Sequence, residues 1–530
     1  MGVNMVKSIK LFFTTFISIG TLVFGTLVQG KEITLIVPQL TDAKTLSPSF
    51  AADTGGYHPT SNIYSHLVVM DWGILEGTSA YGDLAKSWKY SDDAKSVTFY
   101  LHENVKWHDG KNLTSHDVKF TFDTIMDKKY PFAKYLSNVK KISTPDDYTL
   151  VIDLKKPDVA FVAMQAQAAG WTGKIYPKHL WENQDGFDKG PYVNNPIGSG
   201  PFKFKNWVRG SYVELEANKE YFRGKPEIDR LIFKAVSDKN VARAEFDAGN
   251  FPYLPFSYAP PLAEIVALKK DPNIEVIMNQ SHYGRDIQLN LRREPLNKLK
   301  VRKAIAYAID RPKMSKLAFF GLWKPAYYAI VDTQKKWRNE DARFPSHNKE
   351  LAEKLLDEAG YPRKSDGWRF DISVTGPSYQ GCVEIAEVLV QQLQDVGINA
   401  RWDKYDNSAW YTKMTKHDFD ISVYFTRFAP DPDAYREHFG TNGARNFMGF
   451  SNSEFDNLAE EAITLTKFED RKKNYQKMQK ILVDNIPYIQ LFNTLQASLI
   501  RPGWTGFNVQ PSGFNKSITW FGYFAVKPPK

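Results

Sequence analysis

The stretch from Tyr81 to Thr121 constrains the fold of this chain more than any other. It reads YGDLAKSWKYSDDAKSVTFYLHENVKWHDGKNLTSHDVKFT. Val97, Phe99 and Leu101 alternate with more polar residues, which predicts a strand that buries one face. Thr114 stands before a helix-like pattern and is a favoured residue type for a helix N-cap. The stretch therefore predicts strand pairs followed closely by a helix.

Length and composition narrow the class of protein. At 530 residues the chain is too long for one compact core, and we expect two or three domains. The net charge of +9 comes with no stripe of Arg and Lys and no basic tail, which argues against nucleic-acid binding. Aromatic residues make up 14% of the sequence. Large cores explain most of these rings, and a wide pocket lined with rings is the functional interpretation for a few.

The N-terminus has the layout of a secretory signal peptide. Lys7 and Lys10 precede an apolar run over 11–28, and small residues lead to Gly30. We expect residues 1–30 to be removed after Gly30, so that the mature protein is exported. The run is long for a signal peptide, and an uncleaved anchor is the alternative. Several Thr, Ser and Gly residues dilute the run, which favours cleavage.

The single cysteine, Cys382, limits the chemistry of the chain. It excludes a disulfide within the monomer and a cysteine-based zinc site. Because no cysteine stands near the predicted cleavage site, we expect no lipid anchor. An exported protein without an anchor would diffuse away from a cell that has no outer membrane. The periplasm of a Gram-negative bacterium is therefore the expected compartment.

Further motifs follow in order along the chain. NIYSHLVVMD predicts a helix over 62–71, and the residues over 299–311 predict a helix with one apolar face. In IGSGPFKF, Gly198 and Gly200 allow a tight turn before an edge strand. The series is TLSP at 45–48, NIYSHLVVMD at 62–71, IGSGPFKF at 197–204, NKEYF at 218–222, LKVRKAIAYAIDR at 299–311 and YIQLFN at 488–493.

Together with the stretch at 81–121, this ordered series resembles the signature of the extracellular solute-binding proteins of peptide-, nickel- and opine-type ABC importers (solute-binding protein family 5, periplasmic binding protein cluster C). The resemblance covers nearly all of the mature chain. It implies an α/β fold of the two-lobed, type II periplasmic-binding kind, with an extra domain inserted in the first lobe. It also implies a monomer that traps a solute by hinge closure and delivers it to an inner-membrane permease, without a cofactor.

The resemblance also implies how the chain is divided. We expect the first lobe to combine 31–63, 186–286 and 495–530. The inserted small domain should occupy 64–185, and the second lobe 287–494.

The sequence offers no catalytic set. It contains no GxSxG, no HExxH, no phosphate-binding loop and no GxGxxG after a predicted strand. Its histidines are scattered, and none of them has chelating spacing on a predicted element, so we expect no metal site. An exported hydrolase would need a catalytic set, and a periplasmic chaperone would expose apolar surface. We therefore expect a binding protein and not an enzyme.

One segment bears on the ligand. In peptide-binding relatives, a pattern like W..D...DP carries an Asp that pairs with the free α-amino group of the peptide. Here the segment is YFTRFAPDPD, in which Asp431 remains but the amine-binding position falls on Phe428 or Ala429. Neither residue can pair with an ammonium, and burying an unpaired cation costs several kcal/mol. This departure argues against a peptide held by its free N-terminus.

The same segment offers other chemistry. Arg427 stands beside Tyr424 and Phe428, and a guanidinium suits a carboxylate, a phosphate or hydroxyls, while rings suit a sugar face or a flat group. The alternative is that Phe428 packs in a core and Arg427 pairs with Asp431 or Asp433. An oligosaccharide, an opine-like conjugate, a blocked peptide and a metal chelate remain open as ligands. The full set of expected ligand-binding residues is Tyr57, Trp171, Tyr283, Arg285, Trp410, Tyr424, Arg427, Phe428 and Asp431.

Overall fold

The computed structural model of the chain describes residues 32–51, 53–70, 80–164, 173–378, 381–428, 431–507 and 523–530. Residues 33–530 form one compact unit. The predicted signal peptide at 1–30 lies outside the described residues. None of the helices in the described ranges is long and apolar enough to cross a membrane.

A four-stranded sheet opens the fold. Its order is β1 (Thr34–Gln39), β10 (Arg230–Ala235), β9 (Tyr212–Ala217) and β8 (Phe202–Val208). β1 runs parallel to β10, and the other pairs are antiparallel. β8 lies at the sheet edge directly after Pro201, as the sequence predicts.

A second four-stranded sheet contains the 81–121 stretch. Its antiparallel order is β4 (Ala85–Tyr90), β5 (Ser96–Leu101), β7 (Thr149–Leu154) and β6 (Val139–Asp146). The predicted alternation is confirmed, because Val97, Phe99 and Leu101 are buried in a core of their own. Helix α2 (Ser115–Asp127) begins after Thr114, whose backbone N–H donates to the Asp117 carboxylate at 2.9 Å.

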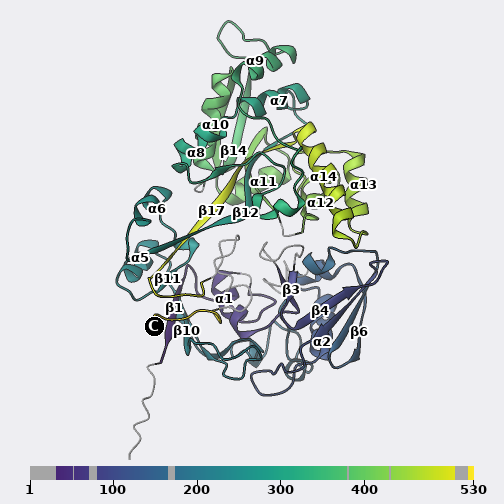
Figure 1. The fold of residues 1–530 in the computed structure, drawn as a ribbon, viewed down its shortest axis with the longest axis vertical. Helices are drawn as coiled ribbons and strands as arrows, with labels where there is room; N and C mark the ends of the chain where they lie inside the picture. Colours follow the sequence, from purple (N-terminus) through teal and green to yellow (C-terminus); the bar gives the residue numbers. More distant parts are fainter. Residues whose placement is uncertain are drawn as a thin grey trace, which may run out of the picture. The chain divides into compact units, whose positions relative to one another are not determined.

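The largest sheet has seven strands. Its order is β11 (Tyr253–Leu254), β17 (Tyr488–Ile500), β12 (Glu275–Leu289), β16 (Ile421–Arg427), β14 (Phe370–Pro377) and β15 (Ile398–Tyr405), with β13 (Lys324–Pro325) paired to β17. β12 and β17 are long antiparallel strands that run from β11 and α6 to the region of β14 and α10 (Figure 1). They are the covalent and hydrogen-bonded connection between the two predicted lobes.

The remaining elements cover these sheets. The helices are α1 (Thr54–Ile63), α4 (Lys178–Trp181), α5 (Lys239–Asp247), α6 (Leu262–Leu268), α7 (Leu299–Ala308), α8 (Arg311–Phe319), α9 (Lys349–Glu358), α10 (Val383–Asp395), α11 (Asn407–Thr415), α12 (Ala434–Phe439), α13 (Ser453–Ala462) and α14 (Phe468–Asn485). Short 3-10 turns lie at Pro131–Leu136, Pro191–Val193, Phe256–Tyr258 and Asp332–Trp337, and a two-stranded sheet joins β2 (Val68–Met70) to β3 (Ala80–Gly82).

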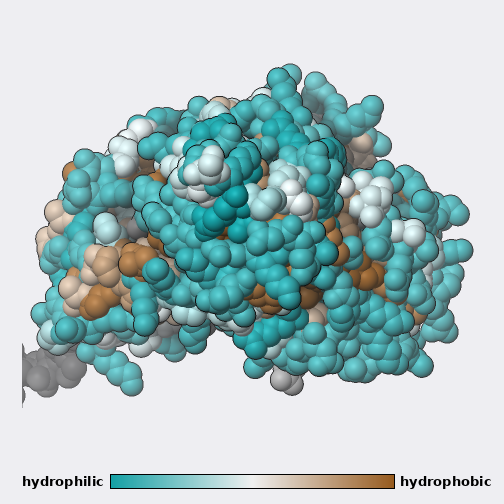
Figure 2. Space-filling model, turned by 90° about the horizontal axis from the view of Figure 1, so that it is seen from above, coloured by the Kyte–Doolittle hydropathy of each residue, from teal (hydrophilic) through white to brown (hydrophobic). Residues whose placement is uncertain are grey.

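The cores are separate. One lies within 67–187, one mainly joins β1, β9 and β10, and two lie between the helices and strands after Ile287. The three-way division of the chain nevertheless stays a prediction, because 33–530 is a single compact unit. The face seen in Figure 2 is mostly hydrophilic, with hydrophobic residues in small patches between hydrophilic ones.

The helix predicted over 62–71 is wrong. Helix α1 starts eight residues earlier, at Thr54, where the Asp53 side chain accepts the Gly56 N–H and caps it, and it ends at Ile63. The β-branched residues Val68 and Val69 belong to strand β2. β-branched side chains lose rotamer freedom in a helix, which favours the strand.

The glycines of IGSGPFKF are required by close packing rather than by their backbone angles. A Cβ at Gly198 would overlap the carbonyl of Ile63, and one at Gly200 would overlap the carbonyls of Asn62 and Ile63. The Gly200 N–H donates to Ile63 O at 2.8 Å. The motif therefore fixes the end of α1 against the start of β8.

We predict that Gly198→Ala destabilises the protein by about 1–3 kcal/mol, since the added methyl must displace backbone. Ser199→Ala in the same turn is the matched control. It removes a buried hydroxyl for which the described residues offer no partner, so little change is expected. Urea unfolding of the two variants checks this, and equal stabilities would contradict the packing argument.

Candidate functional site

Strands β12 and β16 bring several of the predicted ligand-binding residues together. They do so where β12 passes from one predicted lobe to the other, and we call this place the strand crossing. In the β12–β16 register, Tyr283 lies opposite Arg427 and Arg285 lies opposite Phe425. The β12–β17 register is irregular between Gln280 and Gly284, and again after Arg285. The side chains of Tyr283 and Arg427 lie outside what the structure describes. Of these predicted ligand-binding residues, Arg285 is one whose side-chain contacts the structure describes.

Arg285 lies among aromatic rings. Its guanidinium carbon is 5.4 Å from the centre of the Phe425 ring and 6.0 Å from that of Trp323. Trp323 in turn stacks on Phe319 with centroids 3.9 Å apart. Rings at these distances stabilise a cation and hold it in place. The arrangement provides a positive charge on a rigid apolar platform beside the strand crossing.

Asp286, the next residue, is fully buried. One of its oxygens accepts the Thr426 N–H at 2.7 Å, and the other has no hydrogen-bond partner among the described residues. Burial raises the pKa of Asp286 to about 7, although the Thr426 hydrogen bonds and the charge of Arg285 act in the opposite direction. A carboxyl group that changes charge near neutral pH therefore lies next to Arg285.

Trp410 and Tyr424 are both in the interior. Trp410 is 2% exposed, and its indole N–H donates to the Ser422 hydroxyl at 3.0 Å. Its ring centre lies 5.6 Å from that of Tyr424, which stacks on Phe425. Both rings contact Phe425, one of the two rings near Arg285, with centres 6.2 and 5.4 Å away. Their contact with a ligand stays a prediction.

Phe428 and Asp431 are both buried and are engaged by other residues. Phe428 is 1% exposed and packs against Tyr435 in a core. The two oxygens of Asp431 accept from the two terminal nitrogens of Arg471, each at 2.9 Å. The two oxygens of Asp433 likewise accept from Nε and one terminal nitrogen of Arg436, at 3.1 and 2.8 Å. The alternative of Phe428 as a packing residue is thus what the structure shows, and Ala429 lies outside the described residues.

On the first-lobe side, Tyr57 lies in α1 and is 2% exposed. The Lys174 ammonium is 4.8 Å from the centre of its ring. Burial lowers the pKa of Lys174 to about 7, and burial with the nearby Lys174 charge lowers the pKa of His58 to about 3. The buried Lys174 amine therefore loses its proton, and with it its positive charge, near neutral pH. Trp171, the remaining predicted residue, lies outside the described residues.

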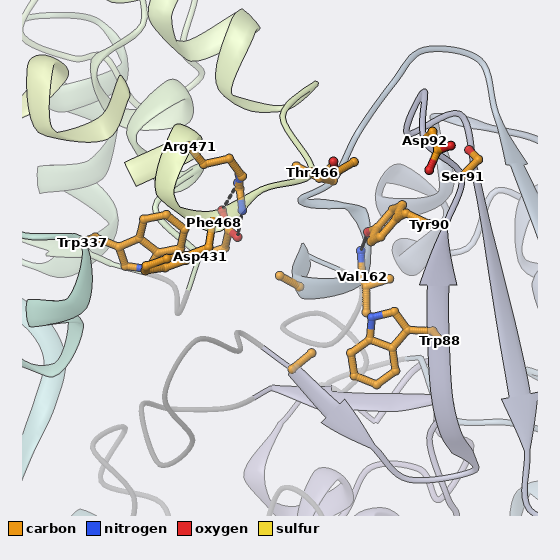
Figure 3. A pocket seen from close by; sticks show the side chains of 13 residues that line it. Trp88, Tyr90, Ser91, Asp92, Val162, Trp337, Asp431, Thr466, Phe468 and Arg471 are labelled. Carbon is orange, nitrogen blue, oxygen red and sulfur yellow. Dashed lines mark hydrogen bonds and ion pairs between the residues drawn. The ribbon is translucent and has the colours of Figure 1, made fainter. Parts of the chain in front are cut away.

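A pocket that sequence reasoning missed lies between β4 and the start of α14. We call it the seam pocket; Trp88, Tyr90 and Val162 line one side, and Trp337, Phe468 and Arg471 the other (Figure 3). Its volume is about 430 Å³, within the range of about 300–1,000 Å³ of small-molecule sites. Trp88 lies inside the 81–121 stretch, but nothing in the sequence pairs it with Trp337.

The two sides of the seam also touch directly. Val159 N–H donates to Ile463 O at 2.8 Å. Next to this contact, burial and repulsion from Asp433 raise the pKa of Asp158 to about 6. Of the described residues, no group of three or more His, Cys, Asp or Glu could hold a metal ion. The described pocket is lined by aromatic rings and by paired charges.

Comparison with known proteins gives the family. The family model described as "Bacterial extracellular solute-binding proteins, family 5 Middle" matches residues 79–447, more than half of the chain. The chain belongs to this family. Because family 5 consists of solute-binding proteins, the general function of this protein is to bind a solute.

Individual relatives support the family assignment. A putative ABC transporter peptide-binding protein of Brucella ovis is 30% identical over 459 residues, covering 82% of each chain. The probable D,D-dipeptide-binding periplasmic protein DdpA of Escherichia coli is 28% identical over 486 residues, covering 90% of this chain and 92% of the relative. The solved structure of the binding protein AgaA from A. tumefaciens R10, in complex with agropinic acid, shares 27% identity with a TM-score of 0.71, covering 94% of this chain and 99% of that chain. The predicted two-lobed α/β fold is confirmed.

We predict that breaking the buried ion pair of this solute-binding protein is costly. Asp431→Asn or Arg471→Met should each lower the free energy of unfolding by about 3–5 kcal/mol, because one charge stays buried without its partner. Combining the two substitutions should recover part of the loss. Asp470→Asn, which breaks an exposed pair with Lys473, is the control and should change little. Denaturant unfolding measures all four; strict additivity of the pair would contradict the coupling.

We predict a pH-dependent stability from Asp286. Its folded-state pKa of about 7 lies above the ordinary value near 3.9, so the stabilising protonated form is complete at low pH and is lost as pH rises through 7. Asp286→Asn should therefore exceed the wild type in stability at pH 8, and this advantage should shrink as pH falls below 7 and disappear near pH 4. Urea unfolding across this range checks it. Asp371→Asn removes an exposed charge on β14 as control, and a pH-independent difference for Asp286→Asn would refute the assignment.

Proposed function

We propose that this protein is the periplasmic solute-capturing component of an ABC importer. In this proposal, residues 1–30 are removed on export, and the mature monomer carries no lipid anchor and delivers its solute to an inner-membrane permease. The family assignment and the Brucella relative, named as an ABC transporter protein, support the transport role. The predicted signal peptide and the position of Cys382 support the compartment.

The mechanism we propose is hinge closure around β12 and β17. A ligand that touches both lobes favours the closed state only by its differential affinity for that state. Hinges concentrate backbone change in a few residues. The irregular register between Gln280 and Gly284 supports a hinge at this point. No bond is made or broken, so the chain's own residues only bind and orient the solute.

The ligand class rests on one observation above the others: the position that would pair with a peptide ammonium is the buried ring of Phe428, and the nearby Asp431 carboxylate is already paired. Phe428 is buried in a core, and the Asp431 carboxylate is occupied on both oxygens by Arg471. An ammonium placed there would stay unpaired, at a cost of several kcal/mol. This supports a solute that is not gripped by a free α-amino group at this position.

Arg285 supports an acidic group on the solute instead. Its guanidinium is placed by the rings of Phe425 and Trp323 at the strand crossing. Charge-assisted hydrogen bonds from a preorganised guanidinium to a carboxylate are among the strong polar contacts in proteins. We propose an acidic, opine-like conjugate as the leading ligand class. AgaA, whose solved structure contains agropinic acid, shows that this fold accepts such a solute.

We predict that acidic conjugates raise the thermal midpoint of the mature protein, from Lys31 onward. The panel would hold opines, free-amine peptides, blocked peptides, oligosaccharides and metal chelates. A ligand at about 100 times its Kd adds about 2.7 kcal/mol of stability. Arg285→Gln should weaken binding of the active compound about tenfold or more.

Arg293→Gln serves as the matched control for this test. It removes a second-lobe guanidinium that pairs with Asp418 and Asp420 away from the crossing, so binding should be unchanged. Calorimetry on the three proteins gives the affinities. A response confined to free-amine peptides, or equal affinities for the wild type and Arg285→Gln, would refute the acidic-ligand proposal.

A further inference from the structure

The seam pocket is built from two aromatic walls. On one side, the half-buried ring of Phe468 provides the accessible face of the wall, and Trp337, which is 1% exposed, packs against it with ring centres 4.6 Å apart. On the other side, Trp88 and Tyr90 come from β4, and the Tyr90 hydroxyl accepts the Val162 N–H at 2.9 Å. Figure 3 shows the two walls facing the same open space. Aromatic faces of this kind pack well against flat or ring-shaped groups.

The charges at the pocket are already neutralised. Arg471 donates to both oxygens of Asp431, to Ala462 O and to the Tyr475 hydroxyl. Because the guanidinium and the Asp431 carboxylate already pair with each other, neither group attracts a charged ligand strongly. Asp92 at the rim is exposed to solvent, which screens its charge. The occupant is thus expected to be neutral.

Hydrogen-bonding groups remain around the rings. Thr466, Asp92 and Tyr90 are among the residues that line the pocket, and the Tyr90 hydroxyl, which accepts the Val162 N–H, can still donate. Hydroxyl groups can donate and accept, and a carboxylate accepts. A purely aromatic occupant would leave these groups unused, whereas a ring bearing hydroxyls would meet both the ring faces and the polar rim. A pocket with apolar walls and a few placed polar groups is typical of small-molecule recognition.

We propose that the seam pocket is a subsite for a neutral, hydroxylated ring of the solute, such as a pyranose residue, held between Trp88 and the Trp337–Phe468 wall. This inference rests on the proposed function, because it assigns a further part of the same solute. A ring held by both walls contacts residues on both sides of the Val159–Ile463 contact. Its binding energy would therefore favour the closed arrangement.

The test is saturation-transfer NMR with methyl pyranosides of glucose, galactose, mannose and N-acetylglucosamine as probes. This measurement detects weak binding, which a single subsite would give. We expect saturation transfer to ring protons of at least one probe with the wild type. Trp88→Ala should weaken that binding about tenfold, and Phe468→Ala from the opposite wall should do the same. Trp402→Ala, a half-buried tryptophan on β15 outside the pocket, is the matched control and should bind as the wild type.

Two outcomes would overturn the inference. One is no saturation transfer from any of the four probes with a wild-type protein that still responds to the acidic panel, which would leave the proposed function standing. The other is undiminished transfer with both Trp88→Ala and Phe468→Ala. Thermal midpoints of the unliganded variants show whether each is folded. A wild type that answers neither the pyranosides nor the acidic panel would refute both proposals together.

Discussion

The antiparallel pairing of β12 with β17 is the interaction on which the rest of the structure depends. These two strands join the part of the chain before Glu275 to the large sheet that β14, β15 and β16 complete. The pairing is interrupted between Gln280 and Gly284, and a side chain at Gly284 would overlap the Gln490 amide. A glycine is needed here because of this close approach. Arg285 follows directly, so any bend at the interruption would also move the proposed ligand contact.

Buried charge is treated in two different ways in this protein. Asp431 is buried with a partner, Arg471, that satisfies both of its oxygens. Asp286 is buried with one backbone hydrogen bond and one unpartnered oxygen among the described residues, and burial raises its pKa to about 7. The first arrangement neutralises two charges that line the seam pocket. The second leaves a carboxyl whose charge depends on pH, as perturbed groups at functional sites often do.

Local patterns in the sequence predicted local structure, and the site needed more than local patterns. The alternation of Val97, Phe99 and Leu101 specified β5, because one buried face is enough to define a strand. The helix expected over 62–71 failed because the pattern there mixes a helix end with β-branched residues that pair as a strand. The departure at Phe428 was visible in the sequence, but the partner of Asp431 was not. Arg471 is brought to Asp431 by the packing of α14, and Trp88 is brought near Trp337 only when two distant segments meet, which no spacing along the chain encodes.

The two proposed contacts differ in chemistry, and this difference has a consequence for how a solute would be oriented. Arg285 offers a positive charge on an aromatic platform, whereas the guanidinium of Arg471 at the seam pocket is occupied by Asp431. In the proposed arrangement an acidic group binds at Arg285, and a neutral ring does not compete with it for that charge. Placing an acid in the seam pocket would cost its desolvation without a free partner. Discrimination of this kind arises as much from the unfavourable alternative as from the favourable contact. A conjugate that carries both groups would thus bind in a single direction, with its acid at Arg285 and its ring between Trp88 and Phe468.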